Sequence, residues 1–200
     1  MSEPLSPPRD PADAKAWFYL DHRLDIETWA ALRQEGRQLL DRCLVALSLE
    51  MEDLAEELGA EPDAAELESG SWPRVGLRHR SWQHQGLADV SVVIQWERAR
   101  LLTASRNEWP FVGILIAETV QDQERRSDIA AALGPVRSAL KGDMTYHWPF
   151  WRYVTPPATA QSLDPAGLAR QAVEAFRQLW DIAAAVLDQL HSADVTRPER

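Results

Sequence analysis

The sequence predicts a single α+β domain: a long N-terminal helix, a central antiparallel or mixed sheet of four to five strands, a helix, an aromatic edge strand and a long C-terminal helix. Three observations carry this prediction. A chain of 200 residues with 45% apolar and 26% charged residues is long enough to bury one sizeable core. Apolar residues repeat with a helical period near both ends, and they alternate with a strand period in the middle. We expect residues 1–14 to be a disordered or draped arm, residues 15–192 to form the domain, and residues 193–200 to be a flexible tail.

The first part of the domain is expected to be one long helix. Four prolines among polar residues keep residues 1–14 from forming a helix. From about Asp21 the pattern becomes helical, and Gly59 with Pro62 ends it after about 35 residues, with a weak point at Gly36. The apolar positions of this helix, which we call the heptad seam, repeat at steps of four and three: Leu40, Leu44, Leu47, Met51, Leu54 and Leu58.

The heptad seam permits two interpretations. In the first, the helix packs along its own domain, which is favoured because the seam persists for fewer than three heptads. In the second, the helix pairs with another chain, and the residues that would make this contact are Leu44, Leu47, Met51 and Leu54. The acidic residues beside the seam would repel an identical parallel helix, so self-pairing would be antiparallel, or the partner would be a different, basic protein.

The middle of the chain is predicted to consist of strands joined by turns. Residues 61–71 have the composition of a polar connector. Val75 and Leu77 then alternate with arginines, which indicates a strand with one basic face. Further extended segments are expected at residues 89–97, 99–104 and 111–117, after a turn at residues 83–87. The last two segments are either the strands of a hairpin or one strand with an irregular approach.

A helical region is expected to follow the strands. Thr119 or Asp122 can cap a helix that ends at Leu133, where Gly-Pro provides a stop. A short second helical turn at residues 136–140 completes this region.

The last elements are an aromatic strand and a long helix. Residues 144–154 have the character of a strand, and Pro149 within them implies a sheet edge or a bulge. Asp164 as N-cap and Pro165 as first residue begin the final helix, whose apolar stripe should end near Ser192.

Charge is distributed unevenly along the chain. The net charge of −10 arises almost entirely from residues 50–68, which hold nine acids and no Lys or Arg, whereas residues 71–107 are basic. Arginines spaced by two on a strand project to one side, and aromatic rings beside them could stack on the bases of single-stranded nucleic acid. This predicted Arg/aromatic face comprises Arg74, Arg78, Arg80, Trp148, Trp151 and Arg152. In the alternative interpretation, the acids of residues 50–68 neutralise the arginines and the aromatic side chains form the core of the sheet.

Asp89 and the tripeptide Gln95-Trp96-Glu97 lie at the two ends of the second expected strand. With these residues and its order of elements, the chain resembles the PD-(D/E)XK nuclease superfamily. The resemblance implies an acid on the second strand and Glu-x-Lys or Gln-x-Lys on the third, which bind a divalent metal and activate water. Here Glu97 stands where the lysine belongs and both halves lie on one strand, so the catalytic motif is not intact.

A second resemblance rests on Trp148-Pro149-Phe150-Trp151. This aromatic segment is similar to one in the sheet-and-helix domain that accompanies such nucleases in bacterial proteins. The likeness would cover roughly residues 72–190, and it supplies no catalytic residue.

No motif for catalysis or cofactor binding is found in the sequence. The longest apolar run, residues 111–117, is far shorter than the ~20 residues of a transmembrane helix, and the first residues do not resemble a signal peptide. We therefore expect a cytoplasmic protein without membrane contact. The lone Cys43 excludes an internal disulfide and a cysteine-based zinc site. The sequence also has no Gly-x-Ser-x-Gly elbow and no glycine-rich phosphate loop, so we expect no catalytic residue, metal or cofactor.

Three hypotheses about function remain. The leading one is a non-enzymatic, bacterial-type interaction or adaptor subunit that assembles through its long helices with itself, as a homodimer, or with another protein. The alternative is a nucleic-acid-binding or degenerate nuclease-like module that uses the Arg/aromatic face. The third is an enzyme whose site is built from scattered residues.

Overall fold

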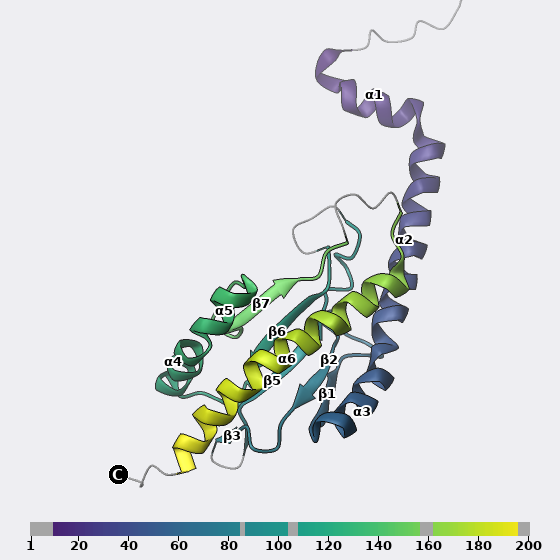
Figure 1. Ribbon diagram of the computed structural model, residues 1–200. Coiled ribbons are helices and arrows are strands. Elements are labelled where there is room, and N and C mark those ends of the chain that lie inside the picture. Colours follow the sequence, from purple (N-terminus) through teal and green to yellow (C-terminus); the bar gives the residue numbers. More distant parts are fainter. Residues whose placement is uncertain (1–9, 85–86, 104–107, 157–161, 196–200) are drawn as a thin grey trace, which may run out of the picture.

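The computed structural model describes residues 10–84, 87–103, 108–156 and 162–195. It shows an α+β fold in which helices cover one face of a five-stranded antiparallel sheet, and a pair of helices extends away from the body (Figure 1). This confirms the predicted fold class. The helices are η1 (Pro11–Asp13), α1 (Ala14–Asp21), α2 (Arg23–Val45), α3 (Leu47–Leu58), α4 (Gln123–Ala132), α5 (Gly134–Leu140) and α6 (Pro165–Val195). The strands are β1 (Glu61–Ala65), β2 (Arg74–Arg78), β3 (Gln83–His84), β4 (Leu87–Ala88), β5 (Val90–Gln95), β6 (Phe111–Ile116) and β7 (Phe150–Tyr153).

The main sheet has the order β1-β2-β5-β6-β7, and every neighbouring pair is antiparallel. Alternate residues of these strands point to the helices, as the period of two predicted. The buried residues on this side are Val75, Leu77, Val90, Val92, Ile94, Val112, Ile114, Ile116 and Phe150. On the opposite face lie Arg74, Gly76 and Arg78 of β2 and, across the sheet, Trp151 of β7, because paired residues of neighbouring strands share a face.

Helix α6 crosses the covered face and contacts β5 and β6 as well as α2, α4 and α5 (Figure 1). Its buried stripe repeats at helical spacing: Leu168, Ala172, Phe176, Leu179, Ala183 and Leu187. The predicted final helix is therefore confirmed. It runs to Val195, three residues beyond the expected end near Ser192.

Several boundaries differ from the predicted ones. The long helix is interrupted at Ala46 rather than at Gly36, and this break lets α3 pack on β1 and β2. Residues 61–65 form the edge strand β1, so the polar connector predicted for residues 61–71 is wrong over that stretch. A two-strand ladder, β3 with β4, occupies part of the turn expected at residues 83–87.

Other local predictions are confirmed. Asp122 caps α4 by accepting a hydrogen bond from the Glu124 amide, and α5 contains the expected second helical turn. Strand β7 begins directly after Pro149 and is the last strand of the sheet order, beside β6, so it is the predicted edge strand. A single antiparallel bridge joins Asp143 to Trp151 on its outer side. Residues 98–103 turn rather than extend, which leaves β6 as a strand with an irregular approach.

Most of the arm predicted at residues 1–14 lies outside the described residues, as do residues 196–200 of the tail. Within the described part, η1 already covers Pro11–Asp13, and Asp10 caps it by accepting a hydrogen bond from the Ala12 amide. None of the helices in the described ranges is long and apolar enough to cross a membrane.

Candidate interaction surface

The heptad seam lies inside the chain's own core. Leu44 is fully buried, Leu47 is 6% exposed, and Met51 and Leu54 are each 1% exposed. These side chains belong to the same apolar cluster as the sheet and α6. The seam therefore packs along its own domain, and the interpretation that these four residues bind another chain is wrong, because contact with a second chain would require opening the core.

The arginines of the predicted Arg/aromatic face are held by acids of β1. Arg78 and Arg80 direct their Nε atoms at the two carboxylate oxygens of Glu61, at 3.3 and 3.0 Å, and Arg74 Nε lies 3.6 Å from Asp63. These pairs follow from the register, because β1 lies antiparallel beside β2. Acids of residues 50–68 thus neutralise these arginines, as the alternative interpretation expected.

The aromatic half of that face is a cluster on the uncovered side of the sheet. Phe111 makes edge-to-face contacts with Trp148, Trp151 and Tyr153, with ring centroids 4.9, 5.9 and 6.2 Å apart. Gly113 permits this arrangement, because a Cβ there would lie 2.8 Å from the Trp148 ring. The aromatic side chains are therefore on the face opposite the main core.

Arg152 does not belong to this aromatic cluster. As the neighbour of Trp151 along β7, it points to the other side of the sheet. Its guanidinium donates hydrogen bonds to the Leu140 carbonyl at 3.3 Å and to Gln178 Oε1 at 2.8 Å. The six predicted residues consequently do not form one surface.

Asp89 and Glu97 cannot share a metal ion in this fold. They lie at opposite ends of β5, and eight residues of extended chain span about 26 Å. No group of three or more candidate metal ligands gathers anywhere in the described ranges.

We predict that the purified protein does not cleave DNA or RNA in the presence of Mg²⁺ or Mn²⁺, because the two acids are too far apart to hold one metal ion. A nuclease assay with and without EDTA checks this. Metal-dependent cleavage that Asp89→Ala abolishes would contradict the prediction.

Asp89 instead anchors a buried ionic cluster that the sequence did not reveal. Its Oδ2 accepts hydrogen bonds from Arg125 Nε of α4 at 2.8 Å and from His191 Nε2 of α6 at 2.9 Å. His191 Nδ1 lies 2.7 Å from the Leu187 carbonyl oxygen. The two ring nitrogens of His191 thus face the Asp89 carboxylate and a backbone carbonyl. The cluster therefore ties β5 to two helices.

The pKa of Asp89 reflects this environment. Burial by itself raises the pKa, but the hydrogen bonds and charges of His191 and Arg125 outweigh burial and lower it below the ordinary 3.8. Asp89, Arg125 and His191 are all at least nine-tenths buried, so this arrangement ties β5 to α4 and α6 inside the core.

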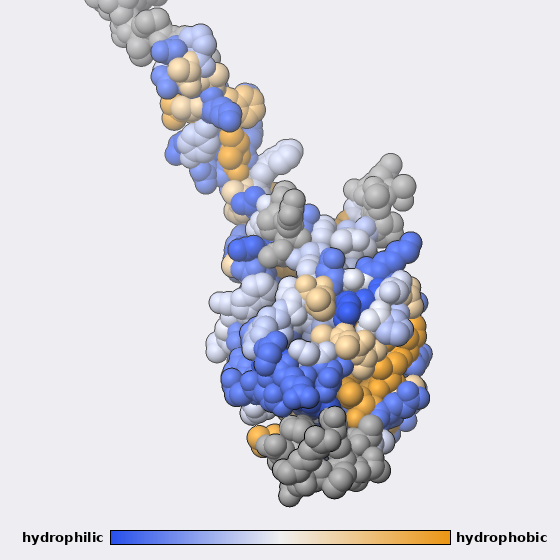
Figure 2. All heavy atoms as spheres, turned by 90° about the vertical axis from the view of Figure 1, so that its left-hand side faces the viewer, coloured by the Kyte–Doolittle hydropathy of each residue, from blue (hydrophilic) through white to orange (hydrophobic). Residues whose placement is uncertain are grey.

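The apolar surface that the core leaves uncovered lies near the N-terminus. Helix α1 and the first part of α2 extend from the body as what we call the helical extension, residues 14–39 (Figure 1). None of its residues is buried, and Leu40 is the first buried residue of the described chain. Seven of the thirteen large apolar side chains exposed in the described ranges lie on it: Phe18, Tyr19, Leu20, Leu24, Trp29, Leu32 and Leu39. Figure 2 shows these helices with apolar side chains between charged ones.

The core-facing stripe of α2 continues along this extension and loses its cover toward the N-terminus, although Arg37 still donates a hydrogen bond to the Ala99 carbonyl of the body. Ile26, Arg33 and Leu40 are spaced by seven residues, which is about two helical turns, so they share one face. Leu40 is fully buried on that face, whereas Trp29, one turn before Arg33, is 74% exposed. The sequence alone predicted only a continuous helical pattern and gave no signal of where the body stops covering it.

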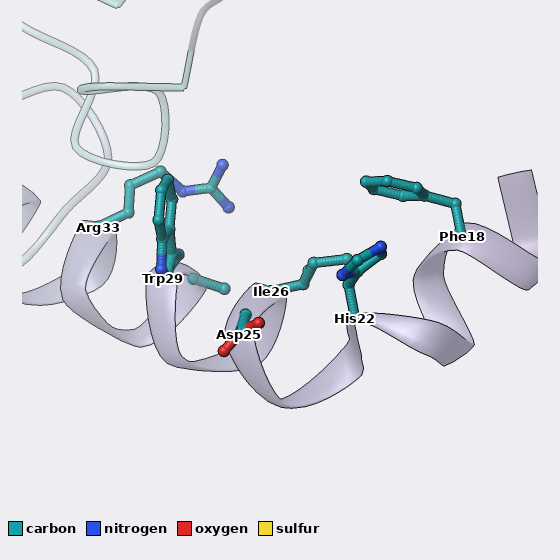
Figure 3. Close-up of a pocket in the computed structure, with 7 residues that line it drawn as sticks. Phe18, His22, Asp25, Ile26, Trp29 and Arg33 are labelled. Carbon is teal, nitrogen blue, oxygen red and sulfur yellow. The ribbon is translucent and has the colours of Figure 1, made fainter.

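A hollow opens where α1 meets α2. It has a volume of about 660 Å³ and is lined by Phe18, His22, Asp25, Ile26, Trp29, Ala30 and Arg33. In Figure 3, Phe18 on α1 and Trp29 on α2 stand on either side of the hollow, with His22 and Ile26 between them. Large rings flanking an open apolar hollow are typical of a surface that receives another apolar group.

Comparison of the chain with protein-family models, with curated proteins and with solved structures found no match.

Proposed function

We propose that this protein is a non-enzymatic interaction subunit that assembles with a protein partner through its helical extension. The observation that carries the proposal is the run of exposed apolar side chains on a pair of helices that its own body does not cover. Apolar side chains exposed on more than one face of the extension are unfavourable in water. A partner that buries them stabilises the complex by roughly 25 cal/mol for each Å² of apolar surface removed from water.

The charged groups of the body support this proposal because they are engaged in ion pairs within the fold. The arginines of β2 are paired with β1, and Asp89 is paired with Arg125 and His191. These groups therefore hold the fold together rather than present a site for chemistry. Binding of nucleic acid by the arginines and aromatic side chains of the outer sheet face stays a prediction, and the ion pairs with Glu61 and Asp63 weaken its basis.

Replacing Leu24 and Trp29 with lysine is expected to abolish association without unfolding the body. Leu24 is 73% exposed and Trp29 is 74% exposed, so neither contributes to the core, and lysine keeps the helix propensity high. The matched control is Leu49→Lys on α3, which is 67% exposed but lies outside the extension.

Association is measured by light scattering of the purified chain and by stoichiometric co-purification from the host, and folding by thermal denaturation. We expect the wild type and the control to associate equally, and the Leu24→Lys/Trp29→Lys variant to lose association with its melting temperature within about 2 °C of wild type. An assembly that the double substitution leaves intact would refute the proposed role of the extension.

A further inference from the structure

The charges of the helical extension are mirrored about Trp29. Residues equally far before and after Trp29 carry opposite charges at every position where both are charged: Asp21 with Arg37, Arg23 with Glu35, and Asp25 with Arg33. No like-charged pair occurs in this mirrored set. Asp21 is the last residue of α1, whereas Arg23, Asp25, Arg33 and Glu35 all lie on α2, and this part of α2 is complementary to itself when a second copy lies antiparallel.

We propose that the partner of the helical extension is a second copy of this chain, bound antiparallel with the two-fold axis at Trp29. This inference rests on the proposed function and names its partner. In an isologous antiparallel pair centred on Trp29, Asp25 of one copy lies level with Arg33 of the other, and the same contact occurs twice. Parallel pairing would instead place Asp25 beside Asp25 and Arg33 beside Arg33, which is repulsive.

Within one chain, the same charges are poorly placed. Arg33 and Arg37 are four residues apart on α2, so two like charges face each other on the helix surface. Arg37 binds the Ala99 carbonyl and Gln34 Oε1. Neither Asp25 nor Arg33 makes an ion pair with any residue in the described ranges, although both line the hollow. A second copy would supply each with the opposite charge.

The antiparallel arrangement also covers Trp29, which stands at one side of the apolar hollow. The two Trp29 side chains meet at the axis, where each covers the other's exposed ring, and a central aromatic side chain is the usual anchor of an interface. The stretch of α2 from Arg23 to Gly36, in which no residue is buried, is about 21 Å long, which allows both charge contacts on either side of Trp29.

Charge reversal tests this arrangement. The dissociation constant of the dimer is measured by sedimentation equilibrium for Asp25→Arg, Arg33→Asp and the variant with both changes. Each single reversal should raise the dissociation constant by about tenfold or more, because two attractive contacts become repulsive. The double reversal restores opposite charges across the axis and should return the constant to within about threefold of wild type. Lys15→Glu, whose mirror position is the uncharged Cys43, is the control and should have a smaller effect.

The outcomes separate this inference from the proposed function. Single reversals without effect, or a double reversal as weak as the singles, would overturn the antiparallel pairing. A wild type that stays monomeric would overturn the second copy as partner, while loss of a stoichiometric host partner on Leu24→Lys/Trp29→Lys would leave the extension's role standing. Dimers that persist in that variant would overturn both.

Discussion

Leu47→Glu combined with Leu54→Glu is expected to leave the chain unfolded. Both side chains lie in the core, where α3 packs on β1 and β2. Burying each carboxylate without a partner costs several kcal/mol, which together approach the roughly 5–15 kcal/mol of stability that a domain has. Far-ultraviolet circular dichroism and thermal denaturation measure the result.

Leu49→Glu is the matched control for this substitution. Leu49 lies on the same helix between the two core positions, but it is 67% exposed, so the same change should leave the fold intact. A double variant that is a folded monomer would contradict the structure and return the heptad seam to an intermolecular role.

Asp89→Asn is expected to cause the second largest loss of stability. The substitution removes the negative charge that Arg125 and His191 share, and it leaves the buried Arg125 guanidinium and His191 ring facing a neutral group. Breaking a buried ionic cluster in this way costs about 3–5 kcal/mol, which lowers the melting temperature by about 10 °C in a chain of this size.

Asp164→Asn provides the comparison for Asp89→Asn. Asp164 also pairs with an arginine, Arg170, at 3.5 Å, but both side chains are about two-thirds exposed, so removing this charge should change stability little. Equal effects of the two substitutions in urea denaturation would show that the Asp89 cluster does not hold the helices to the sheet.

The pH dependence of stability follows from the lowered pKa of Asp89. A carboxyl group whose pKa is lower in the folded chain than the ordinary 3.8 stabilises the fold fully above that value. This contribution is lost as the pH falls through the folded pKa. The difference in unfolding free energy between wild type and Asp89→Asn should therefore shrink as the pH falls below about 4. A difference that stays the same from about pH 4 to about pH 2 would assign it to another group.

Elements with a strong apolar period could be predicted from the sequence, and weakly patterned ones could not. The stripe of α6 repeats over the whole helix, so its period is unambiguous. Strand β1 is different. Glu61 and Asp63 are polar, Pro62 has no amide hydrogen to donate to a neighbouring strand, and an edge strand needs little apolar alternation. The pairing of its acids with the arginines of β2 can be recognised only when the register of the two strands is known.

The candidate sites depended on contacts between distant segments. Asp89 meets Arg125 and His191, which lie 36 and 102 residues further along the chain, and no local pattern encodes such a meeting. The heptad seam and the helical extension show one continuous helical period, so the sequence could not tell which part the body covers. That distinction moved the candidate interface from Leu44 and Leu54 to the residues around Trp29.

Sedimentation velocity of the wild-type chain and the Leu24→Lys/Trp29→Lys variant, at matched concentrations up to about 100 µM, tests the central claim most directly. If the helical extension binds a second copy, the wild type sediments as a dimer and the variant as a folded monomer with an unchanged circular dichroism spectrum. A wild type that remains monomeric at every concentration, or a variant that forms the same dimer as wild type, would contradict it.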